Sequence, residues 1–183
     1  MPSGFLVGLR PARRTAVLAA LIVGMLDLVT KLATVWWLAD APIDLGFVRL
    51  VSHRNPGIAF SLGNNAPFAV VVAITVVAVV AIGVAAWREA LRPPLAAGLM
   101  LGGGLANLVD RLISGSVVDM VDLGWWPVFN VADIALNVGV ALVVLTSILG
   151  ERRGPVTDGA WDNAVAALDR AAGADAVMVD DDA

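Results

Sequence analysis

The chain of 183 residues is 59% hydrophobic and contains no Cys and a single His, whereas soluble domains are about 45–50% apolar. The missing Cys excludes disulfides, thiol nucleophiles and thiolate metal sites, and the single His excludes a His-cluster metal site. Residues 1–150 carry nine Lys or Arg and eight Asp or Glu, while 151–183 carry three and eight. The net charge of −4 therefore comes from the tail, and the chain lacks the basic face that nucleic-acid binding needs.

Four apolar runs in chain order predict an all-α membrane protein with four transmembrane helices, because about 20 apolar residues cross a bilayer and lipid demands an internally satisfied backbone. The first run follows a basic N-terminus but is too long for the h-region of a signal peptide, and no A-x-A-like site closes it. The third contains Gly98 and Gly102, whose G-x-x-x-G spacing lets another helix approach closely. The spans are expected at about 15–38, 66–87, 95–113 and 131–150.

The segments between the runs predict the topology. Seven arginines lie in the N-terminal segment, the 88–94 loop and the start of the tail, so the positive-inside bias places both termini in the cytoplasm and the loops 39–65 and 114–130 outside. Ile43 to Val51 carries a weak strand signal and Asn55-Pro56-Gly57 a turn signal, so a small, partly β outer region is expected. We expect one domain over 1–150 and an acidic, disordered cytoplasmic tail over 151–183.

Several charges lie inside the expected spans, where each costs about 2.5–3.5 kcal/mol on insertion scales. Asp27 and Lys31 are four residues apart with the acid on the N-terminal side, the favourable order for a helix ion pair, and a structural pair is the simplest interpretation. Arg111, at the end of the third span, either snorkels to the headgroups or binds a ligand. Its neighbour Asp110 points in a different direction from it.

Asp119 and Asp133 stand at the two ends of the second outer loop, at the same expected membrane depth. Asn130 can cap the fourth helix, with Asp133 as a first-turn acid that complements the helix dipole, but this explanation leaves Asp119 unexplained. Two carboxylates brought together in a semi-dry site share one proton and titrate as a pair. Such a pair can hydrolyse a peptide bond without a metal or cofactor, one acid activating water while the other polarises the carbonyl.

Other interpretations remain open from the residues alone. A Ser/Lys dyad would join Lys31, the only lysine, to one of several serines. A Ser-His-Asp triad is less favoured because His53 has no G-x-S-x-G partner. A small helical transporter or channel subunit would use the charged residues as a polar pathway, but no clear internal repeat is present. The serines available to a dyad are Ser52, Ser61, Ser114 and Ser116.

A family resemblance covers residues 15–150 and rests on four short motifs. They are Asp27-Leu28-Val29-Thr30-Lys31, Asn55-Pro56-Gly57-Ile58-Ala59-Phe60-Ser61, Gly103-Gly104-Leu105-Ala106-Asn107-Leu108-Val109-Asp110-Arg111 followed by Val117-Val118-Asp119, and Phe129-Asn130-Val131-Ala132-Asp133. With these motifs in this order, the chain resembles the lipoprotein signal peptidases, the signal peptidase II family of bacterial membrane aspartic peptidases. Met120 stands where the family usually has Phe.

The resemblance implies an aspartic endopeptidase that removes signal peptides from diacylglyceryl-modified prolipoproteins by cutting just before the lipidated Cys. It implies Asp119 and Asp133 as the catalytic pair, near the outer face of the bacterial plasma membrane. We expect no cofactor and no metal, a monomer, and membrane lipids and the prolipoprotein as partners. The residues implied at the substrate site are Asn55, Asn107, Arg111 and Asn130. Those implied as its support are Asp27, Lys31, Gly57, Gly104 and Asp110.

Overall fold

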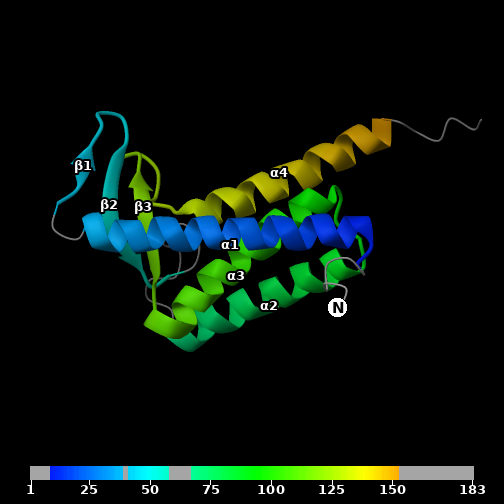
Figure 1. The fold of residues 1–183 in the computed structure, drawn as a ribbon, viewed down its shortest axis with the longest axis horizontal. Helices are drawn as coiled ribbons and strands as arrows, with labels where there is room; N and C mark the ends of the chain where they lie inside the picture. The colour runs from blue at the N-terminus through cyan, green and yellow to red at the C-terminus, as the bar shows by residue number, and fades with distance from the viewer. Residues whose placement is uncertain (1–8, 39–40, 58–66, 153–183) are drawn as a thin grey trace, which may run out of the picture. The chain divides into compact units, whose positions relative to one another are not determined.

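The computed structural model describes residues 9–38, 41–57 and 67–152. Four long helices follow one another in alternating directions (Figure 1). Met1–Ser147 form one compact unit and Ile148–Ala183 a second one. From residue 153 onward the expected acidic tail lies outside the described residues. The helices are α1 (Pro11–Trp37), α2 (Phe68–Trp87), α3 (Pro94–Ser114) and α4 (Val131–Arg152).

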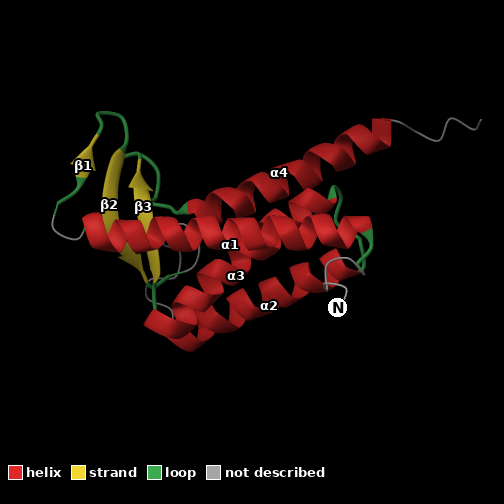
Figure 2. Cartoon of the chain, in the orientation of Figure 1, coloured by secondary structure: helices red, strands yellow, loops and turns green. Residues whose placement is uncertain are grey.

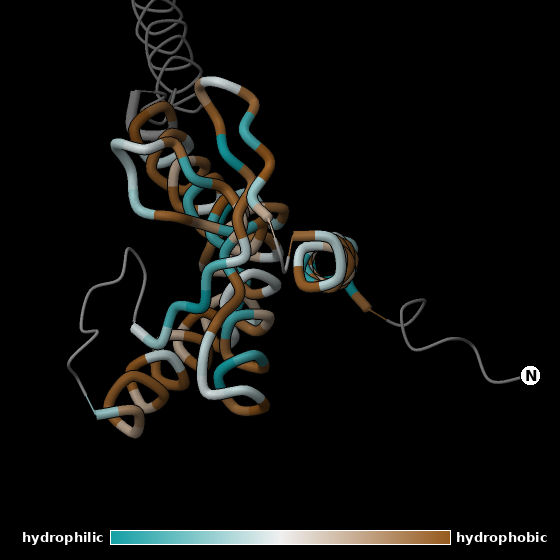
Figure 3. The backbone as a smooth tube through the Cα atoms, turned by 90° about the vertical axis from the view of Figure 1, so that its left-hand side faces the viewer, coloured by the Kyte–Doolittle hydropathy of each residue, from teal (hydrophilic) through white to brown (hydrophobic). Residues whose placement is uncertain are grey.

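All four helices are long and apolar enough to cross a membrane. Much of their surface consists of large apolar side chains, among them Leu21, which is 61% exposed, and Val77, which is 68% exposed. In Figure 3 the hydrophobic colour runs along most of the helical turns. A water-soluble protein rarely exposes so much contiguous apolar surface, whereas lipid favours it. The chain is therefore a multi-pass membrane protein, as its composition predicted.

Proline and glycine residues mark helix ends that the apolar runs alone located less accurately. α1 begins at Pro11 and α3 at Pro94, earlier than expected, because proline has no N–H to leave unpaired in a first turn and its φ already suits a helix. α3 ends at Gly115, whose φ of 73° is left-handed and whose N–H donates to the Arg111 carbonyl at 3.0 Å. The four predicted spans are confirmed, with shifts at their ends.

Glycines on α3 bring its backbone close to two other helices. Gly98 and Gly102 lie against α1, where a Cβ at Gly102 would be 2.7 Å from the carbonyl oxygen of Ala20. The close approach expected from their G-x-x-x-G spacing is confirmed. Gly103 lies against the carbonyl oxygen of Ala132 in the first turn of α4, a contact that leaves no room for a side chain. The position of the start of α4 thus depends on a glycine in α3.

A three-stranded antiparallel sheet stands where α1 ends and α4 begins (Figures 1 and 2). Its order is β1 (Ile43–Asp44), β2 (Arg49–Asn55) and β3 (Val117–Asp122). The predicted partly β region is confirmed, and the segment 43–51 with the weak strand signal contains β1 and the start of β2. A turn at Gly46, with a φ of 90°, divides it into two strands. β3 was not expected, and it contacts α1 and α3, so the sheet leads directly into the helices.

Candidate active site

Lys31 of α1 is the centre of a buried ionic cluster. Its ammonium nitrogen lies 2.6 Å from a carboxylate oxygen of Asp27 and 2.6 Å from one of Asp110. It also donates a hydrogen bond of 3.0 Å to the Oδ1 atom of Asn107. The Asp27–Lys31 ion pair is therefore confirmed, and Asp110 joins it from α3. An ammonium has three donor positions, and these three partners occupy them, which argues against Lys31 as the base of a Ser/Lys dyad.

Asp27 also holds the start of α4. Its Oδ1 atom accepts a hydrogen bond of 2.9 Å from the backbone N–H of Ala132, 105 positions later in the chain. The first N–H groups of a helix have no partner within the helix, and a negative charge at this end complements the helix dipole. The carboxylate of the first span thus caps the last span.

Asn130 and Asp133 form a reciprocal cap on the same helix. The Asp133 N–H donates to Asn130 Oδ1 at 2.9 Å, and the Asn130 N–H donates to Asp133 Oδ2 at 3.3 Å. Such a capping box satisfies two backbone donors at once. The cap expected from the sequence is confirmed. It also restricts the Asp133 carboxylate to one orientation.

Asp119 of β3 lies next to this cap. It is 1% exposed and accepts hydrogen bonds from the side-chain amides of Asn55 at 3.0 Å and Asn130 at 2.6 Å. Because Asn130 contacts Asp133 as well, a single asparagine joins the two carboxylates expected to work together. One comes from the sheet and the other from α4.

Asn107 of α3 connects this pair to the ionic cluster. Its side-chain nitrogen donates to Asp133 Oδ1 at 2.9 Å. Its oxygen accepts from Lys31 and, at 3.2 Å, from the Asn130 amide. Both expected catalytic acids and three of the expected substrate-site residues therefore belong to one hydrogen-bonded network, and the amides fix the carboxylate oxygens in space.

Burial is the main cause that raises the pKa of the Asp119 carboxyl from 3.8 to about 6. The hydrogen bond from Asn55 lowers this pKa, and the neighbouring charge of Asp133 raises it. No described Lys or Arg forms a salt bridge with either aspartate. An acid whose pKa lies near the working pH can both give and take a proton.

Arg111 connects α3 to the turn that follows β2. One guanidinium nitrogen donates to the Asn107 carbonyl at 3.1 Å and another to the Gly57 carbonyl at 2.6 Å. Gly57 in turn donates its N–H to Asn55 Oδ1 at 2.9 Å, closing the predicted turn. Arg111 is 5% exposed, so the snorkelling interpretation is wrong. The rest of that outer-loop motif, from Ile58 to Ser61, lies outside the described residues.

Two cavities reach Asp133 from different sides. The first, of about 140 Å³, lies among α2, α3 and α4, and its polar lining consists of Thr75, Asn107, Arg111 and Asp133. The Nε atom of Arg111 is buried without a partner among the described residues. Gly104, expected as a support residue, lines this cavity too, and a Cβ there would lie 3.0 Å from Val79. The second cavity, of about 260 Å³, includes Trp126 and Phe129.

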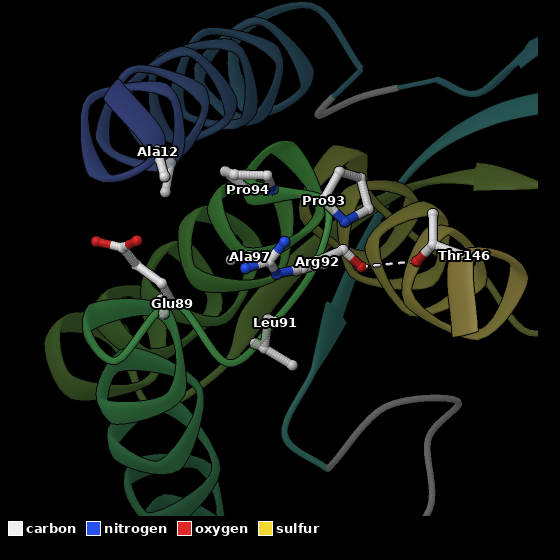
Figure 4. Close-up of a pocket in the computed structure, with 10 residues that line it drawn as sticks. Ala12, Glu89, Leu91, Arg92, Pro93, Pro94, Ala97 and Thr146 are labelled. Carbon is white, nitrogen blue, oxygen red and sulfur yellow. Dashed lines mark hydrogen bonds between the residues drawn. The ribbon is translucent and has the colours of Figure 1, made fainter. Parts of the chain in front are cut away.

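A larger cavity of about 390 Å³ lies at the opposite ends of the helices (Figure 4). Its lining includes Glu89, Arg92 and Thr146, and the Thr146 hydroxyl donates to the Arg92 carbonyl at 2.8 Å. The Glu89 carboxylate, at its edge, lies 3.3 Å from Arg13. None of the residues expected at the site lines this cavity, and no described group of His, Asp or Glu anywhere could hold a metal ion.

Comparison with known proteins connects this geometry to a family. The family model described as signal peptidase (SPase) II matches residues 19–149. The chain belongs to the signal peptidase II family. A lipoprotein signal peptidase of Rhodococcus jostii (strain RHA1) is 42% identical over 142 residues, covering 68% of this chain and 67% of the relative. That of Brevibacillus brevis is 35% identical over 144 residues, covering 74% and 96%.

Solved structures of bacterial membrane enzymes share this fold. One bacterial membrane enzyme superimposes with a TM-score of 0.68 at 26% identity, covering 79% of this chain and 93% of the other. A second superimposes with a TM-score of 0.59 at 31% identity, covering 72% and 91%. The family predicted from the four sequence motifs and the four-helix membrane fold are both confirmed.

Sequence reasoning did not find everything near the two aspartates. It missed the second cavity, because Trp126 and Phe129 come together with α4 only in the folded chain. One signal was present: Asn137 is an amide within a mostly apolar span, where polar side chains are rare and often functional. Its side-chain nitrogen donates to the Asp133 carbonyl at 2.8 Å, and it lines the second cavity.

Proposed function

We propose that this signal peptidase II family member is an aspartic endopeptidase. It removes the signal peptide from diacylglyceryl-modified prolipoproteins and cuts just before the lipidated Cys. The observation that carries the proposal is the convergence of Asp119 and Asp133 on Asn130, with no described cation in a salt bridge to either acid. Two such acids can hold one proton between them.

The two aspartates have different surroundings, which suggests different roles. Asp133 belongs to the first turn of α4, where the positive end of the helix dipole stabilises a carboxylate. Asp119 is buried in β3 with a pKa near 6. In the proposed reaction Asp133 takes a proton from water while protonated Asp119 donates a hydrogen bond to the scissile carbonyl.

The rest of the reaction follows from this division. The oxygen of the activated water bonds to the carbonyl carbon and forms a tetrahedral intermediate. When the C–N bond breaks, the proton taken from water passes to the leaving amine nitrogen, so both acids return to their starting states. Asn55, Asn107 and Asn130 act as positioning residues, because their amides hold the carboxylate oxygens.

The 140 Å³ cavity suits the peptide side of the substrate. Its apolar walls from α2 and α3 match a signal peptide, and Asn107 and Arg111 can hydrogen-bond an unwound peptide backbone. The arginine distribution supports cytoplasmic termini and a site at the outer headgroup level.

The direct test is cleavage of a lipid-modified precursor peptide by the purified chain in lipid nanodiscs. Mass spectrometry should find a cut immediately before the modified Cys, unchanged by a chelator. Asp119→Asn and Asp133→Asn should slow it by about 10²-fold or more, whereas Asp122→Asn should not. Asp122 is the matched control because it lies on the same strand and accepts a hydrogen bond from Gly124 that an asparagine can keep.

Two outcomes would contradict the proposal. Full cleavage by either dyad variant would exclude the aspartic mechanism, and equal cleavage of a precursor with an unmodified Cys would exclude the proposed substrate class.

The expected membrane topology is tested separately by labelling. Because the chain contains no Cys, a single Phe47→Cys substitution in the outer region should react with an impermeant maleimide added outside intact cells.

A further inference from the structure

The first turns of α4 separate the two cavities that reach Asp133. Residues three or four positions apart share a helix face. Asp133 and Leu136 face the 140 Å³ cavity, whereas Ile134 and Val138 face the 260 Å³ cavity. Asp133 lines both, so it lies at the boundary between two faces of one helix. We call the second cavity the α4 groove, and it is lined by Trp126, Phe129, Asp133, Ile134, Asn137 and Val138.

The proposed substrate has the same two-sided form. On one side of the scissile bond lies the signal peptide, and on the other lies a Cys that carries a diacylglyceryl group. A carboxylate that acts on this bond must have the peptide on one side and the acyl chains on the other. Two apolar cavities that meet at one carboxylate provide such an arrangement, and their linings differ enough to tell the two sides apart.

Polar groups distinguish the two cavities. The 140 Å³ cavity contains Asn107 and the buried Nε–H of Arg111, which has no partner among the described residues, and such donors suit peptide carbonyl groups. In the α4 groove, Trp126, Phe129, Ile134 and Val138 are apolar or aromatic, and the surface of the groove is almost entirely apolar. That lining suits acyl chains, which have no hydrogen bonds to satisfy.

We propose that the α4 groove receives the acyl chains of the diacylglyceryl-cysteine. The inference rests on the proposed function and assigns one side of its substrate to one face of α4. Ile134 and Val138 are each 45% exposed along a membrane span, so the groove opens to lipid and the chains enter it without leaving an apolar phase. Asn137 uses one N–H on the Asp133 carbonyl, and its second N–H can bind a glyceryl ester carbonyl.

The test uses precursor peptides that differ only in acyl length, with chains of C8, C12 or C16. Val138→Trp fills the α4 groove, and it should raise the KM for the C16 substrate about tenfold while changing the C8 value and kcat little, because each lost methylene contact weakens binding. Val140→Trp is the matched control. Val140 is exposed on the same helix but lines none of the cavities described above, so every KM should remain unchanged.

Two further variants keep the inference falsifiable if Val138→Trp does not fold. Ile134→Ala widens the groove and should shift the preferred substrate towards longer chains. Ala78→Leu, in the 140 Å³ cavity, should alter the tolerance for residue size before the Cys and leave the chain-length preference unchanged. A chain-length effect from Ala78→Leu, or an equal loss for C8 and C16 with Val138→Trp, would overturn the assignment. Failure of the unaltered chain to cut any lipidated peptide would instead overturn the proposed function.

Discussion

Four buried or half-buried aspartates belong to the same network, yet they have two kinds of partner. Asp27 and Asp110 each lie 2.6 Å from the ammonium of Lys31. Asp119 and Asp133 instead receive hydrogen bonds from neutral amides. A carboxylate beside a cation forms an ion pair that joins helices, whereas two carboxylates held by neutral amides can share a proton. The partner, more than burial itself, separates the structural acids from the proposed catalytic ones.

The largest effect should come from removing the carboxylates held by amides. Asp119→Asn or Asp133→Asn is expected to lower kcat by about 10²–10⁴-fold, the usual contribution of a general acid or base. The fold should persist because asparagine keeps the shape, and circular dichroism in detergent would check it. If Asp27→Asn caused the same loss of kcat with an unchanged thermal midpoint, the division into structural and catalytic acids would be wrong.

Removing the ammonium of Lys31 tests the structural role of Asp27 and Asp110. Lys31→Met leaves Asp27 and Asp110 without their counter-charge and should destabilise the protein by about 3–5 kcal/mol, as for other broken buried pairs. Reversible unfolding in mixed micelles would measure the loss. Adding Asp27→Asn and Asp110→Asn should recover most of it. An inactive Lys31→Met protein of normal stability would contradict this account and revive a chemical role for the lysine.

The contact between Gly103 and the Ala132 carbonyl should have the next largest effect on activity. Gly103→Ala places a methyl group against the Ala132 carbonyl, so the start of α4 and the Asp133 carboxylate must shift. A displacement of about 1 Å can cost about 10² in rate, and kcat should fall accordingly. Gly24→Ala is the control, because a Cβ there meets nothing within 4 Å. Equal activity of the two variants would show that the spacing of α3 and α4 does not position the acid.

The smallest effect concerns pH. If Asp119 holds the proton of the pair, kcat/KM should fall as pH rises through about 6. The hydrogen bond from Asn55 lowers this pKa, so Asn55→Ala should move the midpoint upward, by about one unit at most. A pH–rate profile of both proteins measures the shift, and a downward shift would contradict the assignment.

The pH dependence of the free energy of unfolding is an independent test of the Asp119 pKa. A raised carboxyl pKa means that the folded state binds the proton more tightly than the unfolded state, so stability falls as pH rises from 3.8 to about 6. Asp119→Asn removes this dependence, and the variant should gain stability relative to the unaltered chain across that window. A constant difference between the two proteins would show that Asp119 titrates alike in both states.

The sequence predicted the features that depend on near neighbours in the chain. The apolar runs indicated the four spans, the four-residue spacing indicated the Asp27–Lys31 pair, and Asn130 was recognisable as the cap of the helix that begins after it. The resemblance supplied the residues of the site but not their contacts. The pairing of Asp110 with Lys31 joins two helices, and no local pattern encodes it.

The strand β3 shows the same limit. Val117 and Val118 form only a short apolar run, and such a run becomes a strand through pairing with a neighbour rather than by its own preference. That neighbour, β2, is more than 60 positions earlier, and Asn55 contacts Asp119 across a separation of 64 residues. The geometry of Asp119 was therefore beyond local reasoning.

The hydrogen bond from Ala132 to Asp27 has a consequence for how the protein is made. It joins α1 to α4, which is synthesised later. Until α4 emerges, α1 lacks this partner and Asp133 does not yet exist in the membrane. A nascent chain with three inserted helices therefore lacks one of the two proposed catalytic acids, and the proposed reaction can begin only when the start of α4 has been made.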